Sequence, residues 1–460
     1  MATPPTPPSR SSEKLCGISR LSKNTQLSAV NCRKYPKTHN FRQSTAETLD
    51  FSHRPVYNGN VMKTIQREDY LAKLRDMQDK QIIKVVTGVR RCGKSVLLDL
   101  FRNELQENGV SEKQLIKINF EEPESSFEKS WHQVYKEIEV QLLPNKMNYV
   151  FLDEVQYIAD FERLLVGLYT KKNVDLYVTG SNGHMLSSEL ATLLTGRSYE
   201  INMLPLSFRE YLSVFEDDEQ TAPEKHFANY MNYGGFPQAL DIFLTNPNRV
   251  DEYLEGVYRM IIGRDVLERG KVADQFTLNK VSKFLYDNIG NFYSPTKVAN
   301  ALGTSHHTMA SYIGALVDSF LLYPVNRLHI KGKEQLRTQD KLYAVDLGFR
   351  AMLLGREAEA DTGHILENIV YLELLRRGND VWVGKTGDKE VDFVVQDEKG
   401  YTSYYQVAWT TKDEKTLVRE LAPLESIKDH SPKYLITTDP DEPTHNGIRK
   451  VNAINWLLTH

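Results

Sequence analysis

The fold is decided by the stretch Ile82-Ile83-Lys84-Val85-Val86-Thr87-Gly88-Val89-Arg90-Arg91-Cys92-Gly93-Lys94-Ser95. Its apolar, β-branched first half is typical of a buried strand. Its second half matches G-x-x-x-x-G-K-S, and a helical pattern follows over residues 94–106. In such a strand, loop and helix, backbone N–H groups and the positive helix end bind phosphate groups. The sequence therefore predicts an ATP-binding loop made of Gly88, Val89, Arg90, Arg91, Cys92, Gly93, Lys94 and Ser95.

Two residues of this loop have predicted roles of their own. Lys94 is expected to place its charge on the β- and γ-phosphates, and the Ser95 hydroxyl is expected to reach a magnesium ion. A second strand, Tyr149-Val150-Phe151-Leu152, runs into Asp153 and Glu154. In phosphate-loop enzymes an acid at such a strand end holds the Mg²⁺, so Asp153 is the predicted metal residue together with Ser95. Glu154 is the predicted base that polarises the attacking water.

Two further catalytic candidates follow a third apolar strand, residues 176–179. The run Gly180-Ser181-Asn182 supplies small polar side chains, and Asn182, with Ser181 second, is a candidate for contacting the γ-phosphate or the water. A structural turn is the competing interpretation. Arg197 is a candidate cation for the transferring phosphate, in its own chain or in a neighbouring subunit. The competing interpretation for Arg197 is a surface ion pair.

Alternation of strands and helices over residues 62–215 predicts an α/β domain. The expected strands are 82–87, 115–120, 149–152 and 176–179, with helices at 94–106, 127–141 and 161–169. Such alternation indicates a mostly parallel sheet with helices on both faces, whose ligands lie beyond the carboxyl ends of the strands.

The rest of the chain divides by pattern into four further segments. Residues 1–61 are rich in Pro, Ser and Thr at their start and are predicted to be a disordered tail, with a targeting peptide or a gene-model extension before Met62 as alternatives. Residues 216–275 are expected to be helical. Residues 276–340 contain a helix, a Gly303 turn and a second helix, which indicates a winged helix-turn-helix. Residues 341–460 are expected to form a last α/β domain.

Composition limits the class of protein and its compartment. Hydrophobic residues at 40% and charged residues at 26% are ordinary for a globular chain, and the net charge of −4 argues against a basic coat over the whole chain. No run approaches the ~18 consecutive apolar residues of a membrane span. The chain has only three cysteines, and Cys92 lies inside the phosphate loop. We therefore expect a cytoplasmic protein with no membrane partner.

Several further motifs carry a family resemblance over residues 62–430. They are Thr179-Gly180-Ser181-Asn182, Leu194-Thr195-Gly196-Arg197, Pro205-Leu206-Ser207-Phe208-Arg209-Glu210-Tyr211 and Gly234-Gly235-Phe236-Pro237. With the loop and the acidic strand, they make the chain similar to bacterial and archaeal AAA-type ATPases that carry a C-terminal domain related to the PD-(D/E)XK nuclease fold. The resemblance implies an ATPase core followed by helical, winged-helix and nuclease-like parts.

The C-terminal part departs from the nuclease pattern that it resembles. Asp392 and Glu367 match the family's metal-holding acids, but Gln406 stands in place of the second strand acid and Ala408 in place of the lysine. Neither an amide nor a methyl group supplies the missing charge. We therefore expect a degenerate nuclease fold.

The predicted function is Mg²⁺-dependent ATP hydrolysis by a switch or motor that acts on an unknown protein client. The alternatives are an ATP-driven DNA-processing protein and a nucleotide-gated binding protein that hydrolyses little. The second helix of the helix-turn-helix, from residue 305, carries no Arg or Lys, which favours a structural role or a protein contact over DNA. DNA binding and assembly into a homo-oligomer both stay open at this point.

Overall fold

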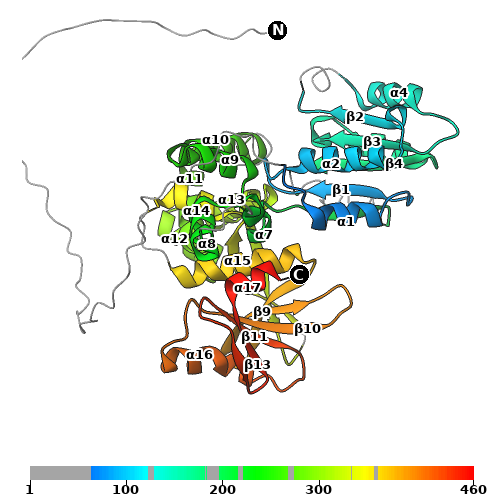
Figure 1. The fold of residues 1–460 in the computed structure, drawn as a ribbon. Coiled ribbons are helices and arrows are strands. Elements are labelled where there is room, and N and C mark those ends of the chain that lie inside the picture. The colour runs from blue at the N-terminus through cyan, green and yellow to red at the C-terminus, as the bar shows by residue number, and fades with distance from the viewer. Residues whose placement is uncertain are drawn as a thin grey trace, which may run out of the picture. The chain divides into compact units, whose positions relative to one another are not determined.

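The computed structural model describes residues 64–122, 129–181, 183, 196–215, 221–267, 274–332, 334–356 and 361–459. The tail expected before Met62 lies outside these ranges. Residues Val56–His460 belong to one compact unit. It contains a parallel sheet near the start of the chain and a mixed sheet near its end, with a group of helices between them in the sequence (Figure 1).

The first sheet has five parallel strands in the order β2-β3-β4-β1-β5. Its strands are β1 (Ile83–Thr87), β2 (Leu115–Asn119), β3 (Asn148–Asp153), β4 (Val174–Gly180) and β5 (Ser198–Asn202). The four expected strands are confirmed. The edge strand β5 was not predicted, because residues such as Ser198, Glu200 and Asn202 give it no continuous apolar run. The predicted α/β fold class is confirmed.

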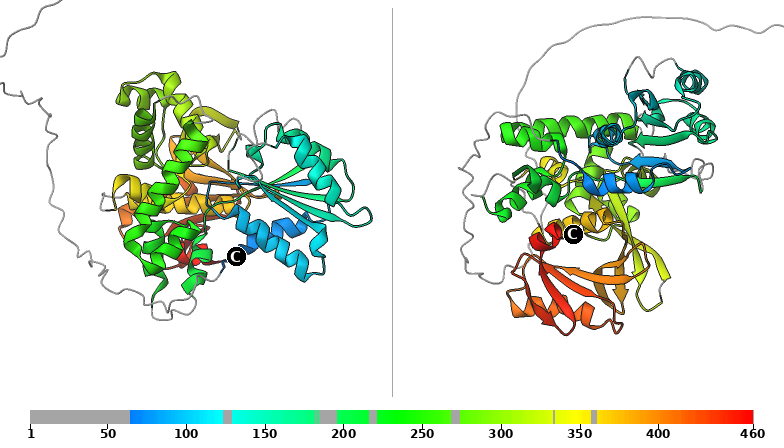
Figure 2. Two further views of the ribbon diagram at one scale, coloured as in Figure 1. Left: turned by 90° about the horizontal axis from the view of Figure 1, so that it is seen from above. Right: turned by 45° about the vertical axis from the view of Figure 1, so that its right-hand side comes forward.

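Alternate residues of each central strand face opposite layers of helices. Val150 and Leu152 of β3 pack with α4 and α5, whereas Tyr149 and Phe151 pack on the side of α1 and α2. Figure 2 shows these helices on the two faces of the sheet. The helices are α1 (Glu68–Asp76), α2 (Lys94–Glu107), α4 (Trp131–Gln141) and α5 (Phe161–Tyr169), with short 3₁₀ turns η1 (Glu112–Gln114) and η2 (Val155–Tyr157).

A helical region follows the first sheet. It comprises α7 (Phe208–Leu212), η4 (Ser213–Phe215), α8 (Pro223–Tyr233), α9 (Pro237–Thr245), η5 (Pro247–Arg249), α10 (Val250–Ile261), the π-helical turn η6 (Ile262–Leu267) and α11 (Gln275–Asp287). Gly234 begins the turn between α8 and α9 with φ +77°, and the Gly235 N–H donates to the buried Asp346 carboxylate. A Cβ at Gly234 would stand 2.1 Å from Asp346 Oδ1 and one at Gly235 would stand 2.5 Å from Leu206 O, which explains the paired glycines of this motif.

The two helices expected around Gly303 are α12 (Pro295–Leu302) and α13 (His306–Asp318), and Gly303 joins them at φ +67°. The strands after it, β6 (Leu322–His329) and β7 (Glu334–Ala344), form a hairpin that joins the second sheet through pairing of β6 with β8. The boundary expected between residues 340 and 341 therefore falls inside β7. These strands do not form a separate wing hairpin, because β6 also pairs with β8.

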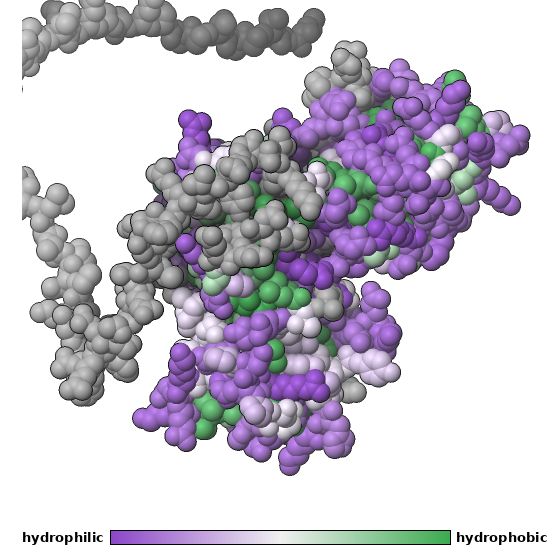
Figure 3. All heavy atoms as spheres, in the orientation of Figure 1, coloured by the Kyte–Doolittle hydropathy of each residue, from purple (hydrophilic) through white to green (hydrophobic). Residues whose placement is uncertain are grey.

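The second sheet has eight strands in the order β12-β13-β11-β10-β9-β8-β6-β7. Its remaining strands are β8 (Asp380–Thr386), β9 (Lys389–Gln396), β10 (Thr402–Val407), β11 (Lys433–Thr437), β12 (Glu442–His445) and β13 (Ile448–Asn452), with helices α14 (Leu347–Leu354), α15 (Thr362–Arg376), α16 (Glu414–Glu425) and α17 (Ala453–Leu458). Hydrophilic side chains cover much of the face drawn in Figure 3. In the described part of the chain, no helix is both long and apolar enough to cross a membrane.

Candidate nucleotide site

The phosphate loop lies between β1 and α2, and its backbone takes conformations that favour glycine. Gly88 has φ +147°, and a Cβ there would stand 2.1 Å from the carbonyl oxygen of Met203. Gly93 has φ +108° at the N-cap of α2, where no side chain caps the helix. The first N–H groups of α2 are therefore left to an incoming group, and this helix end favours an anion.

Lys94 lies across the loop. Its ammonium is buried, donates to the carbonyl oxygens of Gly88 (3.0 Å) and Val89 (3.4 Å), and stands 3.3 Å from Glu154 Oε1. Burial acts most strongly on Lys94 and would lower its pKa, but Glu154 and Cys92 together outweigh burial, and the pKa is raised. Lys94 is thus a buried, charged ammonium held at the loop by groups that an anionic ligand could replace.

Asp153 is the last residue of β3. In the sheet, β4 lies between β3 and β1, the strand that leads into the phosphate loop. Its Oδ1 accepts a hydrogen bond from the Thr179 hydroxyl of β4, whereas its buried Oδ2 has no partner. Burial raises the pKa of Asp153, although the Thr179 hydroxyl and the nearby Ser95 side chain act to lower it. Asp153 and Ser95 therefore lie close to each other, and one carboxylate oxygen of Asp153 is left for a further ligand.

Glu154 adopts the left-handed conformation, with φ +55° and ψ +50°, which is uncommon for a residue other than glycine. Its N–H donates to Thr179 Oγ1 at 2.8 Å, and its carboxylate accepts from Gln156, whose amide also donates to Ser181 Oγ. Burial would raise the pKa of Glu154, but the charges of Lys94 and Arg90 and hydrogen bonds with Gln156 and Ser181 lower it. Glu154 is thus held ionised.

The other predicted loop residues are placed differently from one another. Val89 and Cys92 are fully buried beneath the loop, and burial raises the pKa of the Cys92 thiol. Arg91 is exposed, with φ +68°. The Arg90 side chain is buried and turned to other protein groups, with Asp265 Oδ2 at 2.7 Å from its Nε. For these residues a contact with ATP would come from the backbone.

The two remaining catalytic candidates are Asn182 and Arg197. Asn182 lies outside the described residues. Arg197 precedes β5, and its carbonyl accepts from the N–H of Ile83, the first residue of β1. The phosphate loop follows the last residue of β1, about 15 Å away at ~3.3 Å per residue. Arg197 therefore lies at the amino ends of the strands, whereas its own phosphate loop lies at their carboxyl ends. Its guanidinium faces the Tyr169 ring. The own-chain role considered for Arg197 does not fit this geometry.

Residues that the sequence did not single out support the site. Thr179 bridges Asp153 and Glu154, and Gln156 bridges Glu154 and Ser181. From behind the loop, Arg67 donates to the Cys92 carbonyl at 3.1 Å and forms a buried ion pair with Glu210 at 2.9 Å. Thr179 and Glu210 belong to the motifs that carry the family resemblance, so the sequence offered a reason to consider them. Arg67 and Gln156 lie outside these motifs, and no sequence pattern pointed to them.

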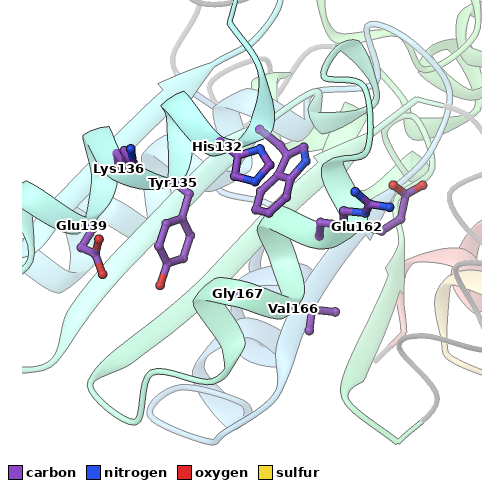
Figure 4. A pocket seen from close by; sticks show the side chains of 9 residues that line it. His132, Tyr135, Lys136, Glu139, Glu162, Val166 and Gly167 are labelled. Carbon is purple, nitrogen blue, oxygen red and sulfur yellow. The ribbon is translucent and has the colours of Figure 1, made fainter.

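The hollow drawn in Figure 4 is a separate feature of the same domain. It has a volume of 580 Å³ and lies between α4 and α5, with Trp131, Tyr135 and Val166 among its lining residues. None of its lining residues belongs to the phosphate loop or to the acidic strand end. It takes no part in the candidate site.

Comparison with known proteins identifies two domains. Residues 80–212 match the model of an AAA domain, and residues 224–360 match a domain of unknown function. The second match ends before Glu367 and Asp392, so the nuclease-like resemblance stays a prediction. Among solved structures, the chain resembles a Walker-type ATPase of Pyrococcus abyssi, with 15% identity, a TM-score of 0.45, and coverage of 63% of this chain and 96% of that one.

Two relatives extend over most of the chain. An uncharacterized protein of Haemophilus influenzae is 37% identical over 407 residues, which are 86% of this chain and 98% of the relative. An uncharacterized protein of Methanocaldococcus jannaschii is 27% identical over 403 residues, 82% of this chain and 87% of the relative. The chain therefore belongs to one family with the Haemophilus influenzae protein, and its residues 80–212 form an AAA-type nucleotide-binding domain.

Proposed function

We propose that this protein binds ATP with Mg²⁺ at the phosphate loop and hydrolyses it. The observation that carries the proposal is the buried contact of Lys94 with Glu154, 3.3 Å apart at the open N-terminus of α2. Phosphate oxygens would compete with Glu154 for the Lys94 ammonium. Nucleotide binding would thus free the Glu154 carboxylate at the moment when a substrate is present.

The residues at the end of β3 suit a magnesium ion. Asp153 Oδ2 is a buried carboxylate oxygen without a partner, and the Ser95 hydroxyl is the second oxygen ligand nearby. Oxygen ligands of this kind, completed by phosphate oxygens and water, are what Mg²⁺ prefers. The ion would neutralise charge on the phosphates.

Glu154 is the proposed base for the attacking water. Its lowered pKa keeps it an ionised acceptor, and the Gln156–Ser181 hydrogen bond fixes its orientation. Asn182 and, from a neighbouring subunit, Arg197 remain proposed contributors whose contacts with nucleotide have to be measured. An Arg197 contribution would require a homo-oligomer.

The proposed use of this chemistry is a nucleotide-dependent switch on a protein client in the cytoplasm. DNA is the second candidate partner, suggested by the α12–α13 arrangement. Against DNA, α13 has no Lys or Arg along its length, so it lacks the charge for phosphate contacts. ATP turnover measured with and without duplex DNA separates the two, because a DNA-driven motor would be stimulated.

The direct test uses Lys94→Ala and Glu154→Gln. Lys94→Ala should lose ATP binding, and Glu154→Gln should keep ATP binding but lose most hydrolysis, by about 10²-fold or more for a general base. Exposed Lys113→Ala and Glu112→Gln, in the same domain, are matched controls that should change neither. Turnover that is unchanged in Glu154→Gln would overturn the assignment of the base.

A further inference from the structure

The Arg90 guanidinium joins the phosphate loop to the helical region. Arg90 Nε and Nη2 donate to the two carboxylate oxygens of Asp265, at 2.7 and 3.0 Å, in a bidentate salt bridge. Asp265 belongs to η6, which continues α10, and is 175 residues further along the chain. Both side chains are almost fully buried, at 3% and 1% exposure.

Both terminal nitrogens of Arg90 also contact groups of the first domain. Nη1 lies 3.2 Å from Glu121 Oε1, just after β2, and Nη2 donates to the Tyr157 hydroxyl in η2, just after β3. Arg264, beside Asp265, contacts the same two groups at 3.5 and 3.4 Å. Segments that follow β1, β2 and β3 thus meet η6 at this one guanidinium.

A change in the Arg90–Asp265 salt bridge would also affect the nucleotide site. A buried guanidinium that loses its buried carboxylate keeps only the partly exposed Glu121 as a counter-charge, so the loop and η6 favour moving together. Arg90 also helps to lower the pKa of Glu154, and it is followed directly by Arg91 in its left-handed conformation. π-helical turns such as η6 are irregularities that often occur at functional positions.

We propose that Asp265 is a positioning residue for ATP turnover, which holds the phosphate loop through Arg90 and passes the loop's nucleotide state to α10 and η6. The proposal rests on the proposed ATPase function. Nucleotide binding would fix the conformation of the loop backbone, and this conformation would determine the position of the Arg90 side chain. Arg90 would in turn hold η6 in place or release it. Residues 224–360, the domain of unknown function, would receive the signal through this contact.

The first test uses the wild-type chain and needs no variant. Amide hydrogen exchange is measured with Mg²⁺ and adenylyl imidodiphosphate, a non-hydrolysable ATP analogue, and compared with the nucleotide-free protein. Exchange should change in residues 255–267 as well as in the loop. Binding of the analogue with no change in residues 255–267 would overturn the proposal and leave ATP binding itself standing.

The second test compares Asp265→Asn with Asp251→Asn. Asp251 is also on α10, but it pairs at the surface with Arg356, and its loss should leave catalysis unchanged. Because coupling between sites commonly changes affinity 5- to 150-fold, we expect Asp265→Asn to raise the KM for ATP about tenfold and to abolish the exchange response of η6. Arg90→Gln should give the same result, and the double variant should add little to either.

The outcomes separate the two proposals. If the wild-type chain neither binds nor hydrolyses ATP, the proposed function fails. If it does both and Asp265→Asn keeps its KM and its exchange response, only the coupling role fails. Should Asp265→Asn not fold, Asp265→Glu, which keeps the charge, has to restore folding and the exchange response. A folded Asp265→Glu without that response would also contradict the role.

Discussion

Single residues at the loop carry the geometry of the site, and Gly88 is the clearest case. Its φ is +147°, and the position that a Cβ would take lies 2.1 Å from Met203 O, so there is no room for a side chain. Gly88→Ala should therefore destabilise the fold by about 2 kcal/mol or more through backbone strain, and weaken ATP binding with it. Thermal unfolding and ATP titration measure both effects.

A glycine in open surroundings is the control for this substitution. Gly314 lies within α13, and nothing stands within 4 Å of a Cβ added there. Gly314→Ala should stabilise the chain by roughly 0.5–1 kcal/mol, because alanine loses less backbone entropy in a helix. If the two substitutions had similar effects, the steric explanation for Gly88 would be wrong.

Glu154 gives the site a pH dependence whose sign can be worked out. Its folded pKa lies below the usual 4.5, so between the two values the unfolded state binds more protons than the folded state. The stabilisation that this group contributes is present above pH 4.5 and is lost as the pH falls through the folded pKa. The difference in free energy of unfolding between wild type and Glu154→Gln should shrink from about pH 7 to about pH 4.

Urea unfolding without nucleotide at the two pH values measures that difference. Glu112→Gln, an exposed substitution, is the control and should differ from wild type by the same small amount at both. If the free energy of unfolding of the wild type, relative to that of Glu154→Gln, grew as the pH fell, the folded pKa of Glu154 would be raised and not lowered.

The sequence predicted those site residues whose role follows from their place along one strand. Asp153, Glu154, Lys94 and Ser95 lie where a strand end or a helix start puts them. The role of Arg90 could not be predicted, because its partner Asp265 is 175 residues away and nothing in the local pattern distinguishes that aspartate. The sequence could not decide between an own-chain and a neighbouring-subunit role for Arg197, because β5, which Arg197 precedes, was not predicted.

At the scale of elements, the connection between α1 and α7 supports the loop from behind. Arg67, at the start of α1, pairs with Glu210 of α7 and donates to Cys92 O and Leu204 O. Arg67 Nε and Glu210 Oε1 approach to 2.9 Å without hydrogen-bond alignment, so the pair is held by charge. This pairing, together with the hydrogen bond from the Ser207 N–H to Glu210 Oε2 at 2.8 Å, is the physical reason for the glutamate in the motif of residues 205–211.

Glu210→Gln should be strongly destabilising. It leaves the Arg67 guanidinium buried without its counter-charge, and breaking one side of a buried pair costs about 3–5 kcal/mol. Glu68→Gln is the control, because its ion pair with Arg75 is exposed and contributes about 0–1 kcal/mol. Denaturant unfolding of both variants is the measurement, and a loss of less than about 1 kcal/mol in Glu210→Gln would contradict the buried-charge argument.

Elements with strong local patterns were predicted well. The helix expected over 161–169 is α5 with the same bounds, and the strand expected over 115–120 is β2, which ends one residue earlier. The partner of the β6–β7 hairpin was not predictable, because strand pairing over long separations is decided by tertiary packing and not by local propensity. For the same reason the sequence placed a boundary inside β7.

At the scale of the whole molecule, β7 of the hairpin brings a lysine to the acids of the second sheet. Lys341 Nζ is buried and lies 2.9 Å from Glu367 Oε1 and 2.8 Å from Glu390 Oε1. The Tyr343 hydroxyl donates to Glu367, and Asp392 Oδ2 accepts from the Val407 N–H. Within the described ranges, no group of three or more His, Cys, Asp or Glu side chains is arranged to hold a metal ion.

The charges of this cluster are satisfied inside the protein. Burial would lower the pKa of Lys341, but Glu367, Asp392 and Glu390 outweigh it and raise the pKa, so the ammonium stays charged. Burial and the nearby Glu367 charge raise the pKa of Asp392, which disfavours a second anion beside Glu367. Lys341 thus supplies the positive charge that a divalent cation would otherwise bring, and the Gln406 amide donates to Glu420 instead.

We therefore predict that the second sheet does not cleave nucleic acid, in keeping with Gln406 and Ala408 in place of an acid and a lysine. Purified protein with Mg²⁺ or Mn²⁺ should cleave neither DNA nor RNA, and Mn²⁺ should not raise its Tm. Lys341→Met should destabilise the fold by about 3–5 kcal/mol because it leaves buried carboxylates unpaired, whereas exposed Lys399→Met should change little. Cleavage by the wild type that is lost in Asp392→Ala would show that Lys341 assists a working metal site, since a purely internal ion pair has no reason to make cleavage depend on Asp392.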